Sequence, residues 1–399
     1  MESNTMNTGK MFLKKSTVQW LCLLAASLLA VACRDDAEIF EPEVEKPALP
    51  DTAGNASSAR AFRGFYLLNE GNMGSNKSTL DYYDFATGEY HRNIYAAANP
   101  GVPMELGDVG NDLQIYGGKL YAVINCSNKI EVMDRHTAKR LGQINIPNCR
   151  YIRFHGGYAY ATSYAGPVEI NPDYEQRGYV AKIDTATFQV LDRCIVGFQP
   201  DELEIAGGKI YVANSGGYMI PRYESTVSVI DLETFAETKR IEVAINLHRL
   251  CLDRHGTLWA TSRGDYYSVP SRLFHIDTQT DICVGMLDVP VSGFCLSGDS
   301  LYIYCTDWSY LSMDNSVSYG IVDVARKEVV CRNFITDGTD GEIAHPYGIM
   351  VHPATKDIYL TDAANHVYPG AVICFDRNGK KKWQVRAGDI PAHFALLAH

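Results

Sequence analysis

The sequence lacks the short motifs that mark many enzyme and cofactor sites. It has no H-E-x-x-H zinc motif, no G-x-S-x-G nucleophile elbow, no phosphate-binding loop and no dinucleotide fingerprint. It also has no C-x-x-C pair and no excess of basic residues, since 36 Lys and Arg stand against 47 Asp and Glu. A formal charge of −11 argues against nucleic acid as a partner. We therefore expect a protein that is not an enzyme and requires no cofactor.

The first 32 residues resemble a bacterial lipoprotein signal peptide. A basic region with Lys10, Lys14 and Lys15 precedes an apolar segment at 21–31, which is too short to span a membrane comfortably. Small residues come directly before Cys33, which would carry acyl chains that anchor the protein in a membrane. The alternative is an ordinary secretory signal followed by an incidental Cys.

The residues after the signal are expected to form a tether. The acidic pair at 35–36 resembles the surface-export signal of lipoproteins displayed outside the outer membrane, and a solvated acidic tether is the alternative. The segment up to residue 61 is rich in Glu, Pro, Ala and Ser, which predicts disorder. The chain therefore divides into a lipoprotein signal peptide (1–32), a lipidated Cys33 with a disordered tether (33–61), and a folded domain (62–397).

Two markers recur seven times along the folded domain. Each repeat has an aromatic residue in a short strand and, roughly twenty residues later, an apolar run that ends in Asp. Such a period indicates stacked units that cannot bury a core alone, and seven strand-rich units predict an all-β fold, a closed seven-bladed β-propeller. The markers are Tyr66, Tyr121, Tyr160, Tyr211, Trp259, Tyr302 and Tyr359, and Asp84, Asp134, Asp184, Asp231, Asp277, Asp323 and Asp376.

Both markers are expected to be structural. An Asp at a fixed turn accepts hydrogen bonds from backbone N–H groups two or three residues further on, and the aromatic ring fills space between blades. One unit shows four expected strands clearly, at 203–205, 210–214, 225–230 and 238–243.

The first blade has no innermost strand of its own before Phe65. The C-terminal segment 390–397 matches the start of a unit with nothing following it. We therefore expect this C-terminal strand to complete blade 1 and close the ring, which removes exposed sheet edges.

The framework repeats, but the residues at one rim of the ring do not. This rim comprises the starts of the innermost strands and the ends of the second strands, which lie on one face around the central channel. It is polar, mixed in charge and aromatic, and Tyr and Trp offer rigid apolar area with a hydrogen-bonding end. The residues expected to bind a ligand are Asn69, Asn125, Arg150, Tyr151, Tyr164, Glu202, Asn214, Tyr218, His248, Arg249, Arg263, Tyr266, Trp308, Tyr347 and His393.

Two metal alternatives are weaker than this interpretation. His248, His345 and His393 lie at rim positions and could hold a metal or supply a base, but surface hydrogen bonding is the simpler role. The acidic segment 337–342 could bind calcium, but its spacing does not fit the twelve-residue loop, which favours a solvated turn. No metal site is predicted.

The cysteine pattern allows one possible disulfide bond. Nine remain after Cys22 in the signal and the lipidated Cys33 are set aside, so at least one thiol stays unpaired within the chain. Most of them lie in apolar strand patterns, where Cys behaves as a small hydrophobic residue. Cys126 and Cys149 could pair at one rim.

The repeat resembles a known class of propeller. The segments 207–214 and 229–234 resemble those of YVTN-type seven-bladed propellers, and the resemblance covers residues 62–397. With Cys33, the acidic pair, the tether and the opening segment 65–72, the chain is similar to BtuG-type surface lipoproteins. This resemblance implies a cell-surface, lipid-anchored outer-membrane protein that captures cobalamin or other corrinoids and passes them to a TonB-dependent transporter. No short motif marks the ligand residues of that family.

Two other functions stay open. A glycan-binding surface lipoprotein of a polysaccharide-uptake system would use the same aromatic residues as stacking platforms. A propeller lyase or lactonase would need a rim His or a metal cluster. The corrinoid comes first because it is large, carries a fringe of amides and has flat, partly apolar faces, which suit a broad preorganised rim.

Overall fold

The computed structural model describes residues 42–48, 61–102, 106–310 and 314–399. Residues Phe40–His399 form one compact unit. The signal peptide, Cys33 and most of the expected tether lie outside the described residues, so those predictions stay predictions. Within the described part of the chain, no helix is both long and apolar enough to cross a membrane.

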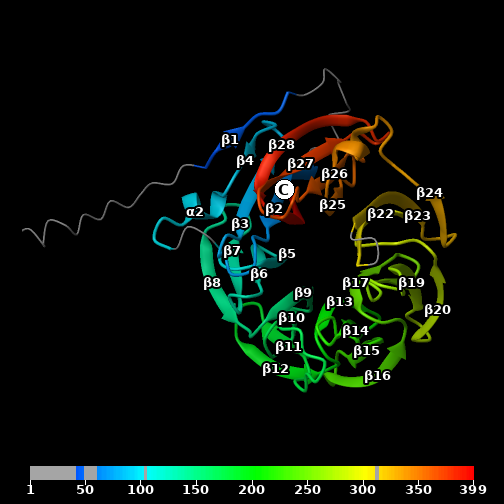
Figure 1. Cartoon of the computed structure of the whole chain (residues 1–399). Coiled ribbons are helices and arrows are strands. Elements are labelled where there is room, and N and C mark those ends of the chain that lie inside the picture. Colours follow the sequence, from blue (N-terminus) through cyan, green and yellow to red (C-terminus); the bar gives the residue numbers. More distant parts are fainter. Residues whose placement is uncertain (1–41, 49–60, 103–105, 311–313) are drawn as a thin grey trace, which may run out of the picture. The chain divides into compact units, whose positions relative to one another are not determined.

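Seven antiparallel sheets form the blades of a ring (Figure 1). This confirms the seven-bladed β-propeller, and each of blades 2 to 7 has four strands in chain order. From the innermost strand outward, these are β5 (Gly110–Tyr116), β6 (Lys119–Ile124), β7 (Lys129–Asp134) and β8 (Arg140–Asn145); β9 (Cys149–His155), β10 (Tyr158–Ser163), β11 (Tyr179–Asp184) and β12 (Val190–Ile195); β13 (Pro200–Ala206), β14 (Lys209–Asn214), β15 (Thr226–Asp231) and β16 (Ala236–Glu242); β17 (Leu247–Leu252), β18 (Thr257–Ser262), β19 (Arg272–Asp277) and β20 (Ile282–Leu287); β21 (Gly293–Ser297), β22 (Ser300–Ser309), β23 (Asp314–Asp323) and β24 (Glu328–Cys331); β25 (Pro346–Val351), β26 (Ile358–Asp362), β27 (Pro369–Phe375) and β28 (Lys381–Asp389).

Blade 1 joins the two ends of the propeller. Its innermost strand is the C-terminal β29 (Pro391–Ala398), which pairs with β2 (Phe62–Asn69) along its whole length. The strands β3 (Thr79–Asp84) and β4 (Tyr90–His91) follow outward, and the short helix α2 (Ile94–Ala98) comes next in the chain. The predicted closure of blade 1 is therefore confirmed.

Part of the expected tether is ordered, and the prediction of disorder is wrong for residues 42–48. Strand β1 (Val44–Glu45) pairs with β4 and becomes the fifth strand of blade 1. The outer edge of β4 offers unpaired backbone groups, and an ion pair between Glu43 and Arg92 adds to this pairing. Composition indicates little apolar burial, but it does not register the backbone pairing that an open sheet edge offers.

The repeated Asp residues cap the turns, as expected. The carboxylate of Asp231 accepts hydrogen bonds from the backbone N–H groups of Glu233 at 3.1 Å and Thr234 at 2.8 Å. Hydrogen bonds from the backbone and hydroxyl of Thr234 lower the pKa of Asp231. The same backbone contacts occur at the turn that begins with Asp184. These carboxylates therefore have a structural role in the turns.

The repeated aromatic residues pack between blades, also as expected. Trp259 and Tyr211 are fully buried, although Tyr302 is only partly so. The Tyr211 hydroxyl donates to the Asp281 carboxylate at 2.6 Å in the next blade, and Tyr66 reaches the carbonyl of Arg135 in the same manner at 2.8 Å. Tyr211 and Tyr66 thus tie their blades to a turn of the following one, whereas Trp259 donates to Asp253 of its own blade at 2.9 Å.

Two of the alternative sites are not formed. Cys126 and Cys149 are free thiols, and Sγ of the buried Cys149 donates to the carbonyl of Lys129 at 3.3 Å instead. The acidic segment contains the 3-10 helix η2 (Thr339–Glu342), and the Asp337 carboxylate accepts from the backbone N–H of Thr339 at 3.1 Å and that of Lys381 at 2.7 Å. This segment is a hydrogen-bonded turn.

Candidate functional site

A cavity of about 660 Å³ lies at the predicted rim, and all seven blades contribute to its lining. The innermost strands begin here, and the loops that follow the second strands form the rest of the wall. Eleven of the predicted residues line it: Asn125, Arg150, Tyr151, Tyr218, His248, Arg249, Arg263, Tyr266, Trp308, Tyr347 and His393.

The other four predicted residues do not line the cavity. Asn69, Tyr164, Glu202 and Asn214 are almost fully buried in its walls. The Asn214 amide, for example, donates to hydroxyls within blade 4 at 2.8 and 3.0 Å. The register of the repeat places these residues correctly at the rim end of the strands. Their side chains, however, are buried in the blades and do not face the cavity.

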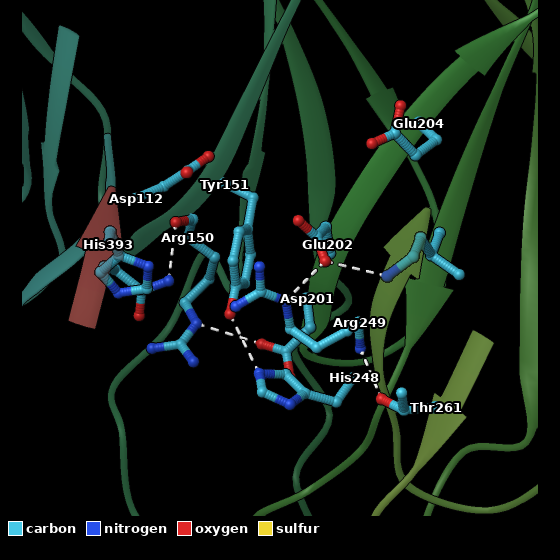
Figure 2. A network of polar contacts seen from close by, with 12 residues as sticks. Asp112, Arg150, Tyr151, Asp201, Glu202, Glu204, His248, Arg249, Thr261 and His393 are labelled. Atoms are coloured by element: carbon cyan, nitrogen blue, oxygen red, sulfur yellow. Dashed lines mark hydrogen bonds and ion pairs between the residues drawn. The ribbon is translucent and has the colours of Figure 1, made fainter. Parts of the chain in front are cut away.

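The buried carboxylate of Asp201 organises one side of the cavity (Figure 2). Its oxygens pair with Nε of Arg150 at 3.1 Å and with Nη1 of Arg263 at 3.2 Å, and the Tyr164 hydroxyl donates to it at 2.8 Å. One carboxylate therefore holds two guanidinium groups that come from blades 3 and 5.

Glu202, the next residue of β13, forms a second set of ion pairs. Its carboxylate pairs with Nε of Arg249 at 2.7 Å and also with Arg153. Arg153 in turn pairs with Asp112 at 3.0 Å and Glu204 at 3.1 Å. Burial acts to lower the pKa of Arg249, but Glu202, Tyr151, Tyr304 and Asp112 together raise that pKa above the usual value. The guanidinium groups stay charged.

His248 lies among these arginines. Its Nε2 forms a hydrogen bond with the Tyr151 hydroxyl at 3.0 Å. Burial, followed by the charges of Arg263 and Arg249, lowers the pKa of His248 well below its ordinary value. The imidazole is therefore neutral at pH 7 and offers both a donor and an acceptor nitrogen.

A second polar group occupies the part of the cavity formed by blades 1 and 7. Glu70 accepts from the Tyr347 hydroxyl at 2.9 Å and pairs with Nε2 of His393 at 2.9 Å. Burial and the charge of Glu70 raise the pKa of Tyr347 well above its ordinary value, so its hydroxyl remains a donor. His345 and His366 lie next to this group, with ring centroids 4.9 Å apart.

Several lining residues were not in the predicted set. Glu70 directly follows the last residue of β2, so the repeat register carried a signal for it. Tyr304 lies two residues after the marker Tyr302 in β22, which at ten residues is longer than the equivalent strands. Asn315 lies at the start of the long strand β23, opposite Trp308, and His366 lies in the loop between β26 and β27, where the repeat gives no register.

The three rim histidines line one cavity, but they do not form a metal site. In the portion of the chain that the structure describes, no group of three or more His, Cys, Asp or Glu side chains is placed to hold a metal ion. His393 is instead hydrogen-bonded to Glu70, and His345 to Asn315 at 2.9 Å.

The family model of the domain of unknown function DUF5074 matches residues 63–392. The chain belongs to the DUF5074 family. The DUF5074 match extends from β2 to the beginning of β29 and so includes the cavity lining, apart from His393. No curated protein sequence matches the chain.

Solved structures with the same fold are distant in sequence. A quinonprotein alcohol dehydrogenase-like protein from Bacteroides thetaiotaomicron is 14% identical with a TM-score of 0.58, over 84% of this chain and 78% of that chain. Hydrazine synthase of Kuenenia stuttgartiensis is 16% identical with a TM-score of 0.54, over 67% of this chain and 77% of that chain. At such identities these likenesses extend to the fold alone.

Proposed function

We propose that this DUF5074 protein is a binding protein that captures a ligand in the rim cavity, with no catalytic step and no cofactor. The preorganised cavity carries this proposal. Buried carboxylates already hold its guanidinium groups, so these side chains lose little conformational freedom when a ligand binds. A site of about 660 Å³ is within the usual size range of small-molecule sites.

Cobalamin or another corrinoid is the first candidate ligand. Such a molecule is larger than most ligands of a cavity of this size, so one part would enter and the rest would lie over the rim. The amide fringe suits the guanidinium groups, and the flat faces suit the rings of Tyr218, Tyr266 and Trp308.

The setting proposed for this capture is the cell surface. Cys33 would anchor the protein in the outer membrane, the acidic pair favours display outside it, and a TonB-dependent transporter would receive the ligand. This part of the proposal rests on the sequence and on the resemblance to BtuG-type lipoproteins.

Calorimetric titration with cyanocobalamin tests the ligand. We expect saturable one-to-one binding that Trp308→Ala weakens at least tenfold. The matched control is Tyr158→Ala, because Tyr158 lies at the hairpin end of β10, away from the cavity. No binding of any corrinoid at micromolar concentration would reject the corrinoid, and binding that Trp308→Ala leaves unchanged would place the ligand outside this cavity.

One observation favours a glycan as the second candidate. Tyr267 and Tyr310 stack with centroids 5.0 Å apart at 18°, and about half of each side chain is exposed. Exposed stacked rings of this kind offer a platform for the flat faces of sugars. Binding of a polysaccharide in affinity electrophoresis, lost in Tyr310→Ala while cyanocobalamin produces no heat, would favour this candidate over the corrinoid.

A further inference from the structure

We propose that the rim cavity contains a subsite for a phosphate-class oxyanion of the ligand, formed by Arg150, Arg249 and Arg263. These three residues are called the arginine wall below. The inference rests on the proposed function, because it names the chemical group that a captured ligand presents to blades 3 to 5.

The charges of the arginine wall are layered. The side chains of Arg150, Arg249 and Arg263 line the cavity and are 12, 24 and 29% exposed. The carboxylates of Asp201 and Glu202 lie beneath them and are 0 and 2% exposed. The guanidinium groups line the cavity and their carboxylates lie behind them, so the positive ends of these ion pairs are the ones that a ligand meets.

The guanidinium groups are held in place before any ligand binds. Arg150 lies 4.8 Å above the ring of buried Tyr164, and Arg249 lies 5.5 Å above that of Tyr151. Both use Nε for their carboxylates, and among the described residues no hydrogen bond joins their Nη groups to another residue. A guanidinium with free Nη groups presents a planar fork that matches the oxygens of a phosphate.

The rest of the cavity restricts where an anion can lie. The neutral His248 between the arginines adds a hydrogen-bonding nitrogen without a charge of its own. Glu70 carries a negative charge in the part formed by blades 1 and 7, where it is hydrogen-bonded to Tyr347 and His393. An oxyanion is therefore repelled from that part and attracted to the arginine wall.

The proposed subsite predicts different affinities for two corrinoids. Cyanocobalamin carries a phosphodiester in its nucleotide loop, and dicyanocobinamide lacks this group while keeping the corrin ring and its amides. If the arginine wall binds the phosphodiester, the two compounds differ in affinity, and the difference depends on the arginines.

The test measures both compounds and inorganic phosphate on the full-length protein in detergent. We expect Arg263→Gln to lower the affinity for cyanocobalamin at least tenfold and the affinity for dicyanocobinamide less than twofold. Inorganic phosphate at constant ionic strength should quench the fluorescence of Trp308 saturably, more weakly in Arg263→Gln and not at all in Trp308→Phe. Arg222→Gln is the matched control, because Arg222 is exposed and outside the cavity. Arg263→Lys, which keeps the charge but loses the fork, should give intermediate affinities and serves if Arg263→Gln does not fold.

The outcomes distinguish this inference from the proposed function. The subsite would be overturned if Arg263→Gln lowered the affinity for both corrinoids equally, or for neither, and if phosphate binding did not depend on Arg263. Corrinoid capture would remain supported in that case. Phosphate binding that depends on Arg263, with no corrinoid bound, would support the subsite and reject the corrinoid. If phosphate produces no change in any variant and no corrinoid binds, both proposals are rejected.

Discussion

Two consecutive carboxylates at the start of β13 determine how the polar residues of the cavity are arranged. Asp201 holds Arg150 and Arg263, while Glu202 holds Arg249 and the deeper Arg153. The two residues lie where the pairing of β13 with β14 shifts register, between Pro200 and Leu203, and each carboxylate binds its own pair of arginines. Their main effect is to hold the arginines in position, since a buried ion pair by itself adds little stability over an apolar replacement.

Removal of one of these carboxylates should be costly. Asp201→Asn keeps the shape but leaves Arg150 and Arg263 partly buried without a counter-charge. We expect a loss of about 3 kcal/mol in the free energy of unfolding, measured with urea. Asp173→Asn, at an exposed ion pair with Arg222, is the control and should change it by less than about 0.5 kcal/mol. Equal effects of the two variants would contradict the role assigned to Asp201.

His248 gives a pH dependence with a defined sign. Its pKa is lowered well below the ordinary value by burial and the nearby arginines, so the unfolded chain takes up this proton first as the pH falls. Stability is therefore lost below about pH 6.5, by at most about 1.4 kcal/mol for each pH unit. We expect His248→Gln to lose less stability between pH 7 and 5 than the natural protein in urea unfolding.

The control for this pH effect is His155→Gln, because His155 is exposed on a hairpin. It should follow the natural protein across the same pH range. A slope for His248→Gln as steep as that of the natural protein would show that the proton uptake belongs to other groups, such as His275, His352 or His366, whose pKa values burial also lowers.

At the scale of elements, the ring depends on one strand. The sequence register identified β29 as the missing strand of blade 1, because only the C-terminal segment began a unit without continuing it. Deletion of residues 390–399 should prevent stable folding, since it exposes the inner edge of β2 and opens the ring. The measurement is thermal unfolding by circular dichroism, with removal of His399 alone as the control. A truncated protein that unfolds as cooperatively as the full chain would contradict closure by β29.

A single glycine tests the same junction without a truncation. A Cβ added at Gly348 in β25 would lie 2.1 Å from the backbone oxygen of Ala392 in β29, and backbone cannot yield as a flexible side chain does. We expect Gly348→Ala to lower the free energy of unfolding by about 1–3 kcal/mol. Gly341→Ala, where a Cβ would meet open space, is the control. Similar stability of the two variants would indicate that blades 1 and 7 are not packed this closely.

At the scale of the whole molecule, the proposed lipid anchor at Cys33 would determine where the proposed capture takes place. We expect Cys33→Ser to abolish incorporation of radiolabelled palmitate and to release the protein from the membrane fraction. Protease added to intact cells should digest the natural protein if it is displayed on the surface. Resistance to that protease, with lipidation intact, would place the propeller on the periplasmic side and remove the proposed route to a surface transporter.

The ring, its number of blades and its closure could all be predicted from the sequence. These follow from a repeated pattern of apolar residues and turns, and every copy of the pattern reinforces the same register. The sequence also located the cavity, because the rim is where the repeat breaks down.

The sequence could not predict which side chains of the rim face the cavity. Arg263 follows the second strand of blade 5 and Asn214 ends that of blade 4, yet Arg263 lines the cavity and Asn214 is buried and bonds hydroxyls inside its blade. The pairing of Arg150 and Arg263 on Asp201 joins residues from three blades. Sequence register gives the height of a residue along the channel, whereas burial and hydrogen bonding with the neighbouring blades set the direction of its side chain.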